Sequence, residues 1–129
     1  MTTDLMYLTW TALFTSLLFL PYTNALVMKH GLSAAVGNRD KEYPLAAWAE
    51  RLKRAHLNAV ENLVVFAAVV LVAHVSGKHN AATAMAALIY FWCRVGHVVI
   101  YTAGIIWART LIWVASWICV LAIIWQILS

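Results

Sequence analysis

The segment RAHLNAVENLVVFAAVVLVAHV, Arg54 to Val75, decides the fold. Its second half, Leu63 to Val75, is almost entirely apolar, while its first half carries Arg54, Asn58 and Glu61. A helix needs about 20 mostly apolar residues to cross the hydrocarbon core of a bilayer. The segment therefore predicts a membrane-spanning helix with polar side chains near one end.

The composition of the whole chain supports a membrane protein. Of its 129 residues, 64% are hydrophobic and only 11% are charged, whereas soluble domains carry about a quarter charged residues. A single domain, residues 1–129, is the expectation at this length. Cys93 and Cys119 lie in separate apolar segments without metal or redox spacing, so they are interpreted as packing residues.

Four apolar segments have the length of a span. They run from about Leu5 to Met28, from a lead-in near Leu45 to Val75, from Ala81 to Ile106, and from Leu111 to Leu128. Pro21 lies inside the first and is expected at a kink, which a membrane helix tolerates. No strand-like alternation competes, so we expect an all-α bundle of four transmembrane helices.

The connections predict an antiparallel, up-down arrangement. SGKHN (residues 76–80) and WART (residues 107–110) each read as a tight turn, while KHGLSAAVGNRDKEYP (residues 29–44) is a longer loop rich in turn residues. His74 and His79 flank the SGKHN turn, but their spacing does not suggest a metal site, and no metal is expected.

The Lys and Arg residues predict the orientation, because positive charge gathers on the cytoplasmic side. One side has only Lys78; the other has Lys29, Arg39, Lys41, Arg51, Lys53, Arg54 and Arg109. The long first loop should therefore face the cytoplasm in an integral multi-pass protein, for which a bacterial inner membrane is the expected location. The formal charge of +4 follows from these flanking residues, so nucleic-acid binding is not expected.

Two stripes of polar residues extend into the spans. Arg54, Asn58 and Glu61 follow a helical spacing on the second span. Arg94, His97 and Tyr101 do the same on the third span. Polar groups at membrane depth are costly and usually mark function.

The two stripes match in depth. In an antiparallel hairpin, residues equally far from the turn lie at equal depth. Counting from Gly77 and Lys78 pairs Glu61 with Arg94, Asn58 with His97, and Arg54 with Tyr101. We therefore expect an ion pair between Glu61 and Arg94 at the deepest of three layers.

These layers indicate the chemistry of a ligand. Guanidinium groups suit carboxylates, and the Glu61 carboxylate suits an ammonium group. Glutathione has two carboxylates, one ammonium group and a thiol, and a nearby Arg favours the thiolate. Arg109, at the end of the third span, is placed for that role.

ERLKRAHLNAVENL (residues 50–63) and CRVGHVVIYTAGIIWARTLIW (residues 93–113) resemble the MAPEG family, the membrane-associated proteins in eicosanoid and glutathione metabolism. The loop HGLSAAVGNRD (residues 30–40) is similar to that of the small bacterial members. The resemblance implies a homotrimer of four-helix protomers that holds glutathione, as co-substrate, in crevices between protomers open to the cytoplasm.

The resemblance also implies roles for individual residues. The ligand site is implied to include Arg54, Asn58, Glu61, Arg94, His97, Tyr101 and His56. Arg109, with Tyr101, is implied to be catalytic through stabilisation of the thiolate. His56 lies on the opposite helix face from Asn58, so it either touches the ligand across a protomer boundary or caps the loop.

The sequence departs from the family pattern in its first helix. Many relatives place an Arg of that helix on the ligand, whereas the first Arg here is Arg39, in the loop. Asn24 and Lys29 are the available substitutes. Thr110 follows Arg109 where some relatives carry Ser, so the hydroxyl is retained.

The function expected from these observations is that of a glutathione-dependent membrane transferase or peroxidase acting on hydrophobic electrophiles or lipid hydroperoxides. The alternative is a non-catalytic lipid-binding scaffold of the same family, although the polar set is complete here. A small multidrug transporter is disfavoured, because such transporters rely on a Glu in the first span, and this span has none.

Overall fold

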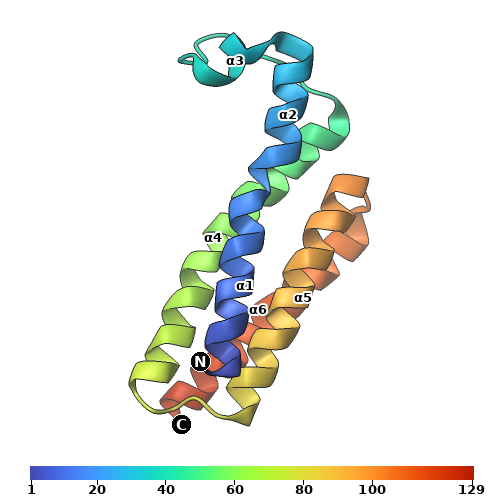
Figure 1. Cartoon of the computed structure of the whole chain (residues 1–129). Coiled ribbons are helices and arrows are strands. Elements are labelled where there is room, and N and C mark those ends of the chain that lie inside the picture. The colour runs from blue at the N-terminus through green and yellow to red at the C-terminus, as the bar shows by residue number, and fades with distance from the viewer.

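The computed structural model describes residues 1–129 and is built from helices alone (Figure 1). The elements are α1 Thr3–Leu17, α2 Phe19–His30, α3 Leu32–Val36, α4 Ala47–Val75, α5 Ala81–Ala103 and α6 Ile106–Leu128. Four helical segments are long and apolar enough to cross a membrane: α1 together with α2, α4, α5 and α6. The predicted all-α fold with four spans is confirmed.

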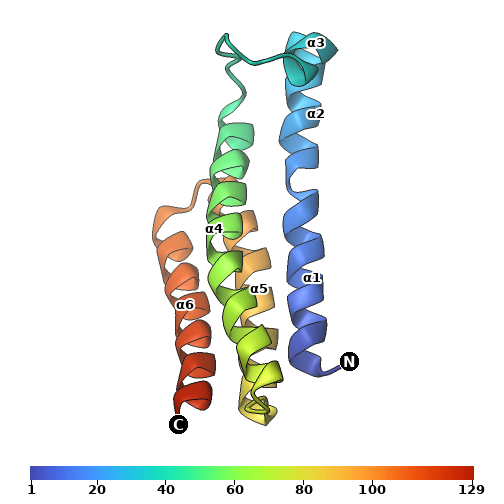
Figure 2. The same ribbon diagram turned by 90° about the vertical axis from the view of Figure 1, so that its left-hand side faces the viewer.

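The long helices lie side by side, and the chain reverses its direction at each connection (Figures 1 and 2). Both termini lie at one end of the bundle. At the other end, α2 and the start of α4 project beyond the α5–α6 turn, and α3 lies across the end of α2. The basic residues of the long loop are therefore gathered at the projecting end.

The first span is interrupted between α1 and α2, as expected from Pro21. A proline has no N–H group and its ring clashes with the carbonyl four residues earlier, which here belongs to Leu17. The helix breaks at this place: Leu18 bonds back only three residues, its N–H donating to the carbonyl of Thr15 at 3.3 Å. The kink thus lies one turn before the proline.

Of the two predicted tight turns, one is confirmed and the other is wrong. SGKHN connects α4 to α5 as predicted, with Gly77 at a φ of 70° and Asn80 capping α5. The prediction for WART was wrong, because these residues belong to the first turns of α6. Gly104, at a φ of 84°, ends α5 instead, since glycine adopts this left-handed conformation without a steric penalty.

The interior has two apolar clusters separated along α5 by a polar layer. The larger contains Phe66, Val70, Ala73, Ala86, Ala87, Tyr90, Cys119, Val120 and Ile123. The smaller contains Leu18, Leu52, Ala55, Ala59 and Val98. Between them on α5 lie the buried Arg94 and His97. Most other large apolar side chains are exposed on the outside, where a bilayer would cover them.

A buried carboxylate ties α1 to α5 at the end that holds the termini. Asp4 is only 2% exposed, and its Oδ2 accepts a hydrogen bond of 3.2 Å from the hydroxyl of Thr83. Thr83 also completes the capping box of Asn80. Sequence reasoning did not single out Asp4.

Gly96 lets α6 approach α5 closely, which gives a test of the packing. A Cβ atom at Gly96 would lie 2.6 Å from Cδ1 of Ile112. We expect Gly96→Val to lower the stability by about 1–3 kcal/mol through overpacking, measured by unfolding in detergent. Combining it with Ile112→Ala should restore part of the loss; equal damage in the double variant would contradict this packing.

Candidate functional site

The polar layer is organised by Arg94, which is 1% exposed. Its Nη2 donates a hydrogen bond of 2.6 Å to Oδ1 of Asn58 on α4 and lies 3.4 Å from Nδ1 of His97. Its Nε and Nη1 have no hydrogen-bond partner. The guanidinium group is therefore a buried cation that is bonded to an amide, with no carboxylate beside it.

The expected ion pair between Glu61 and Arg94 is wrong. All three guanidinium nitrogens of Arg94 are accounted for without a carboxylate, and Glu61 is exposed on the outside of α4. Asn58 takes the place on Arg94 that had been assigned to Glu61.

The reason is the direction of the side chains around α4 rather than their depth. Successive residues of an α-helix are rotated by about 100°. Ala59 is buried and marks the side of α4 that packs against the other helices. Asn58, one position away, lies at the edge of that side, whereas Glu61, two positions away, points almost opposite. Counting residues from the turn predicted the depth of each side chain but not the direction in which it points.

A small cavity of about 190 Å³ opens beside the polar layer, between α4, α5 and α6. Its lining residues are Asn58, His97, Tyr101, Arg109, Thr110 and Trp113. We call this cavity the Tyr101 hollow. It brings together four of the residues expected at the site, Asn58, His97, Tyr101 and Arg109, from three different helices.

Arg109 reaches the hollow because α6 begins earlier than the sequence indicated. It lies one turn into α6, and its Cζ stands 4.5 Å from the centre of the Tyr101 ring, within the range of a cation–π contact. The His97 ring packs edge-on to the same tyrosine at 5.6 Å. Two aromatic rings and a guanidinium group thus form one wall.

The hydrogen bonds of the polar layer decide which atoms face the hollow. Oδ1 of Asn58 accepts from Arg94 and from Nδ2 of Asn62 at 3.3 Å, so the Asn58 amide N–H groups remain free. Arg94 can only donate, so Nδ1 of His97 is the acceptor and the ring proton lies on Nε2. Together with the Tyr101 hydroxyl and Arg109, the available groups are mainly donors, which suits an anion.

The other expected residues lie elsewhere. Arg54 is exposed and does not contact Tyr101, which packs under Arg109 instead. His56 accepts or donates a 2.7 Å hydrogen bond between its Nδ1 and the hydroxyl of Tyr22 on α2, a contact that neither interpretation of His56 anticipated. Asn24 and Lys29 are exposed on α2 and do not line the hollow.

Sequence reasoning missed two residues of this region. Asn62 orients Asn58, and its position four residues further along the same helix could have revealed it. Trp113 lines the hollow as well. No group of three or more His, Cys, Asp or Glu side chains is placed to hold a metal ion.

The contact between Arg94 and Asn58 can be tested by stability. Asn58→Leu removes the one acceptor on α4 for a buried cation, and hydrogen bonds to charged groups contribute about 1.5–3 kcal/mol. We expect a loss of this size in detergent unfolding experiments. Glu61→Gln, which touches neither atom, should unfold like the wild type. A comparable loss of stability in that variant would instead support an ion pair between Glu61 and Arg94.

Comparison with known proteins identifies the family. The sequence model of the MAPEG family matches residues 7–129, nearly the whole chain. No curated protein and no solved structure matched the chain. The match agrees with the four apolar helices, and it covers both polar stripes. The chain therefore belongs to the MAPEG family, a family of multi-pass membrane proteins related to glutathione transferases and peroxidases.

Proposed function

We propose that this MAPEG protein is a glutathione-dependent membrane enzyme that acts on hydrophobic electrophiles or lipid hydroperoxides. The observation that carries the proposal is the Tyr101 hollow, in which Arg109, Tyr101, His97 and Asn58 meet between three helices that are apolar enough to span a membrane. A cavity that offers mainly hydrogen-bond donors and lies beside an unpaired buried cation is suited to an anion. In glutathione, the anions are its carboxylates and its thiolate.

The size of the hollow limits what it can hold. Its volume of about 190 Å³ is below the usual 300–1,000 Å³ of a complete ligand pocket. It therefore accommodates one end of a tripeptide, and the remainder extends over the adjoining outer face of α4. That face carries the exposed Arg54 and Glu61, which suit a carboxylate and the ammonium group.

The exposed Glu61 supports association with a further copy of the chain, as in the homotrimer that the family implies. A carboxylate facing lipid at membrane depth is costly, so a surface of protein or a water-filled crevice should cover it. A neighbouring copy of the chain would provide this cover and would enclose the part of glutathione outside the hollow. Its α2 would also be the source of Asn24 or Lys29. The basic residues at the projecting end support an opening to the cytoplasm.

The proposed mechanism places the thiol under Arg109. The guanidinium group stabilises the thiolate, whose proton leaves through the open end, and the Tyr101 hydroxyl donates a hydrogen bond to the sulfur. In conjugation, the sulfur bonds to the electrophilic carbon and the leaving group departs with the bonding pair. In peroxide reduction, the sulfur takes the terminal oxygen, the O–O bond breaks, and the alkoxide gains a proton. A second glutathione then reduces the sulfenic acid to disulfide and water.

Calorimetric titration with glutathione tests the ligand. We expect the wild type to bind and both Arg54→Ala and Glu61→Gln to bind at least tenfold more weakly, because each removes one charge partner. Size-exclusion chromatography with light scattering must show the same oligomer in all three. Equal binding by the three proteins would refute the proposed ligand.

The reactivity and the absorbance of the bound thiolate test whether the site is catalytic. Removing the cation with Arg109→Gln should lower kcat/KM toward a model electrophile by about 10²–10³-fold, the usual effect of losing one group that stabilises a developing charge. The ultraviolet absorbance of bound thiolate should fall with it. Lys78→Gln removes an equal charge away from the hollow and should leave both unchanged. Binding of glutathione without a thiolate signal in the wild type would favour the non-catalytic scaffold.

A further inference from the structure

A second and larger hollow lies between α2, the loop after α3 and the start of α4. It consists of two adjoining cavities of about 400 Å³ and 490 Å³, which share Tyr22, Glu50 and Lys53. We call it the Tyr22 hollow. It shares no residue with the Tyr101 hollow. His56 and Asn58, one in the wall of each, are two positions apart and therefore point to opposite sides of α4.

Hydrogen bonds fix the walls of the Tyr22 hollow. The hydroxyl of Tyr22 and Nδ1 of His56 join α2 to α4 at 2.7 Å. The backbone N–H of Leu45 donates to Oε1 of Glu50 at 3.3 Å, and Nε2 of His30 lies 2.7 Å from the carbonyl of Pro44. The loop is thus held over the gap between the two helices, so the hollow is a built feature of the fold.

The mouth of the hollow carries an excess of positive charge. Its basic residues are Arg39, Lys41, Lys53 and Arg54, and its acidic residues are Glu42 and Glu50. Glu50 is already engaged by the Leu45 amide. Arg39 holds a left-handed backbone with a φ of 59°, which is uncommon for a residue other than glycine. The mouth is therefore suited to an anionic group.

The deeper wall of the hollow is apolar. It is formed by Leu26 of α2 and by Leu57 and Val60 of α4, within helices that are apolar enough to span the bilayer. Leu57 is 61% exposed and Val60 is 41% exposed. A basic mouth above an apolar wall matches an amphiphile with an anionic headgroup and a hydrocarbon chain. Basic pockets between transmembrane helices bind anionic lipid headgroups in this way.

We propose that the Tyr22 hollow is a binding site for an anionic phospholipid, which adjoins the site proposed for glutathione at Arg54 and has its own headgroup ligands. The headgroup phosphate lies at Lys41 and Lys53, and an acyl chain follows Leu57 and Val60 into the bilayer. Lysine suits this role, because its ammonium group is a compact charge on a flexible stem. The bound lipid bridges α2, the loop and α4, and it offsets the repulsion among the basic residues.

Native mass spectrometry of the purified protein tests the site. The probes are phosphatidylglycerol, which is anionic, phosphatidylcholine, which is zwitterionic, and inorganic phosphate. Phosphatidylglycerol should be retained preferentially. A lysine near the surface contributes about 1 kcal/mol to binding an anionic lipid, which is about fivefold in affinity. Lys53→Gln combined with Lys41→Gln should therefore weaken retention by about 25-fold.

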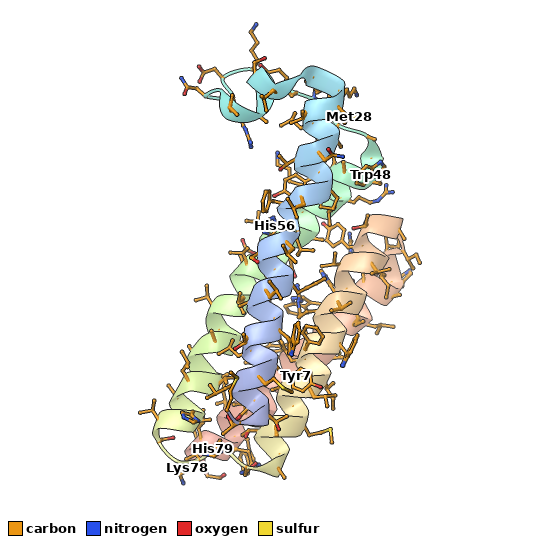
Figure 3. All side chains as sticks on the ribbon, viewed as in Figure 1. Tyr7, Met28, Trp48, His56, Lys78 and His79 are labelled. Carbon is orange, nitrogen blue, oxygen red and sulfur yellow. The ribbon has the colours of Figure 1, made fainter.

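Lys78→Gln is the matched control, because it removes the same kind of charge at the opposite end of the bundle (Figure 3). It should retain phosphatidylglycerol like the wild type. Equal weakening by Lys78→Gln, equal retention of the two lipids, or displacement of the lipid by millimolar phosphate would each overturn the proposal. Displacement by glutathione would overturn it as well, because the two sites would then be one. Failure of glutathione to bind leaves the lipid result unaffected, so the two proposals fail independently.

Discussion

The hydrogen bond between Arg94 and Asn58 is the constraint on which the rest of the structure depends. Arg94 places a positive charge between two apolar clusters, where removing an ion from water costs several kcal/mol. Only one of its nitrogens has an acceptor on another helix. The bond therefore sets how α4 is rotated against α5, because turning α4 by one residue would leave the cation without its acceptor. The same rotation determines which polar groups of α4 face inward and which face outward.

This arrangement separates two kinds of polar surface on α4. Asn58 points toward α5 and α6, where it joins His97, Tyr101 and Arg109 around a small hollow. Glu61 is exposed on the outer face. An ion pair with Arg94 would have neutralised its charge, but no such pair forms. A carboxylate that is not used inside the protomer is available for a ligand or for a neighbouring copy. The unpaired cation inside and the unpaired anion outside thus both support a site that is completed by a zwitterionic ligand.

Helix α4 also serves as the common wall of two different hollows. The Tyr101 side offers aromatic rings, an amide and one half-buried Arg, which suits a single anionic group held at close range. The Tyr22 side offers lysines on flexible stems above an apolar wall, which suits the headgroup and chain of a lipid. Because residues two apart on a helix point in nearly opposite directions, a short segment such as residues 53–60 can supply both. Helix α2 gives the second hollow its other side.

The sequence by itself determined the four spans, a break in the first span caused by Pro21 and the polar stripes, because apolar length and helical spacing are properties of the chain segment alone. It also indicated Asn58, His97, Tyr101 and Arg109, which the fold brings together. Only the tertiary structure decided the partner of Arg94, the contact of His56 with Tyr22, and the start of α6 at Ile106 instead of after WART. Depth can be counted from a turn, but the rotation of each helix is set by its contacts with its neighbours, and for α4 these include the bond between Asn58 and Arg94. That rotation left Asn58 rather than Glu61 within reach of the buried guanidinium group.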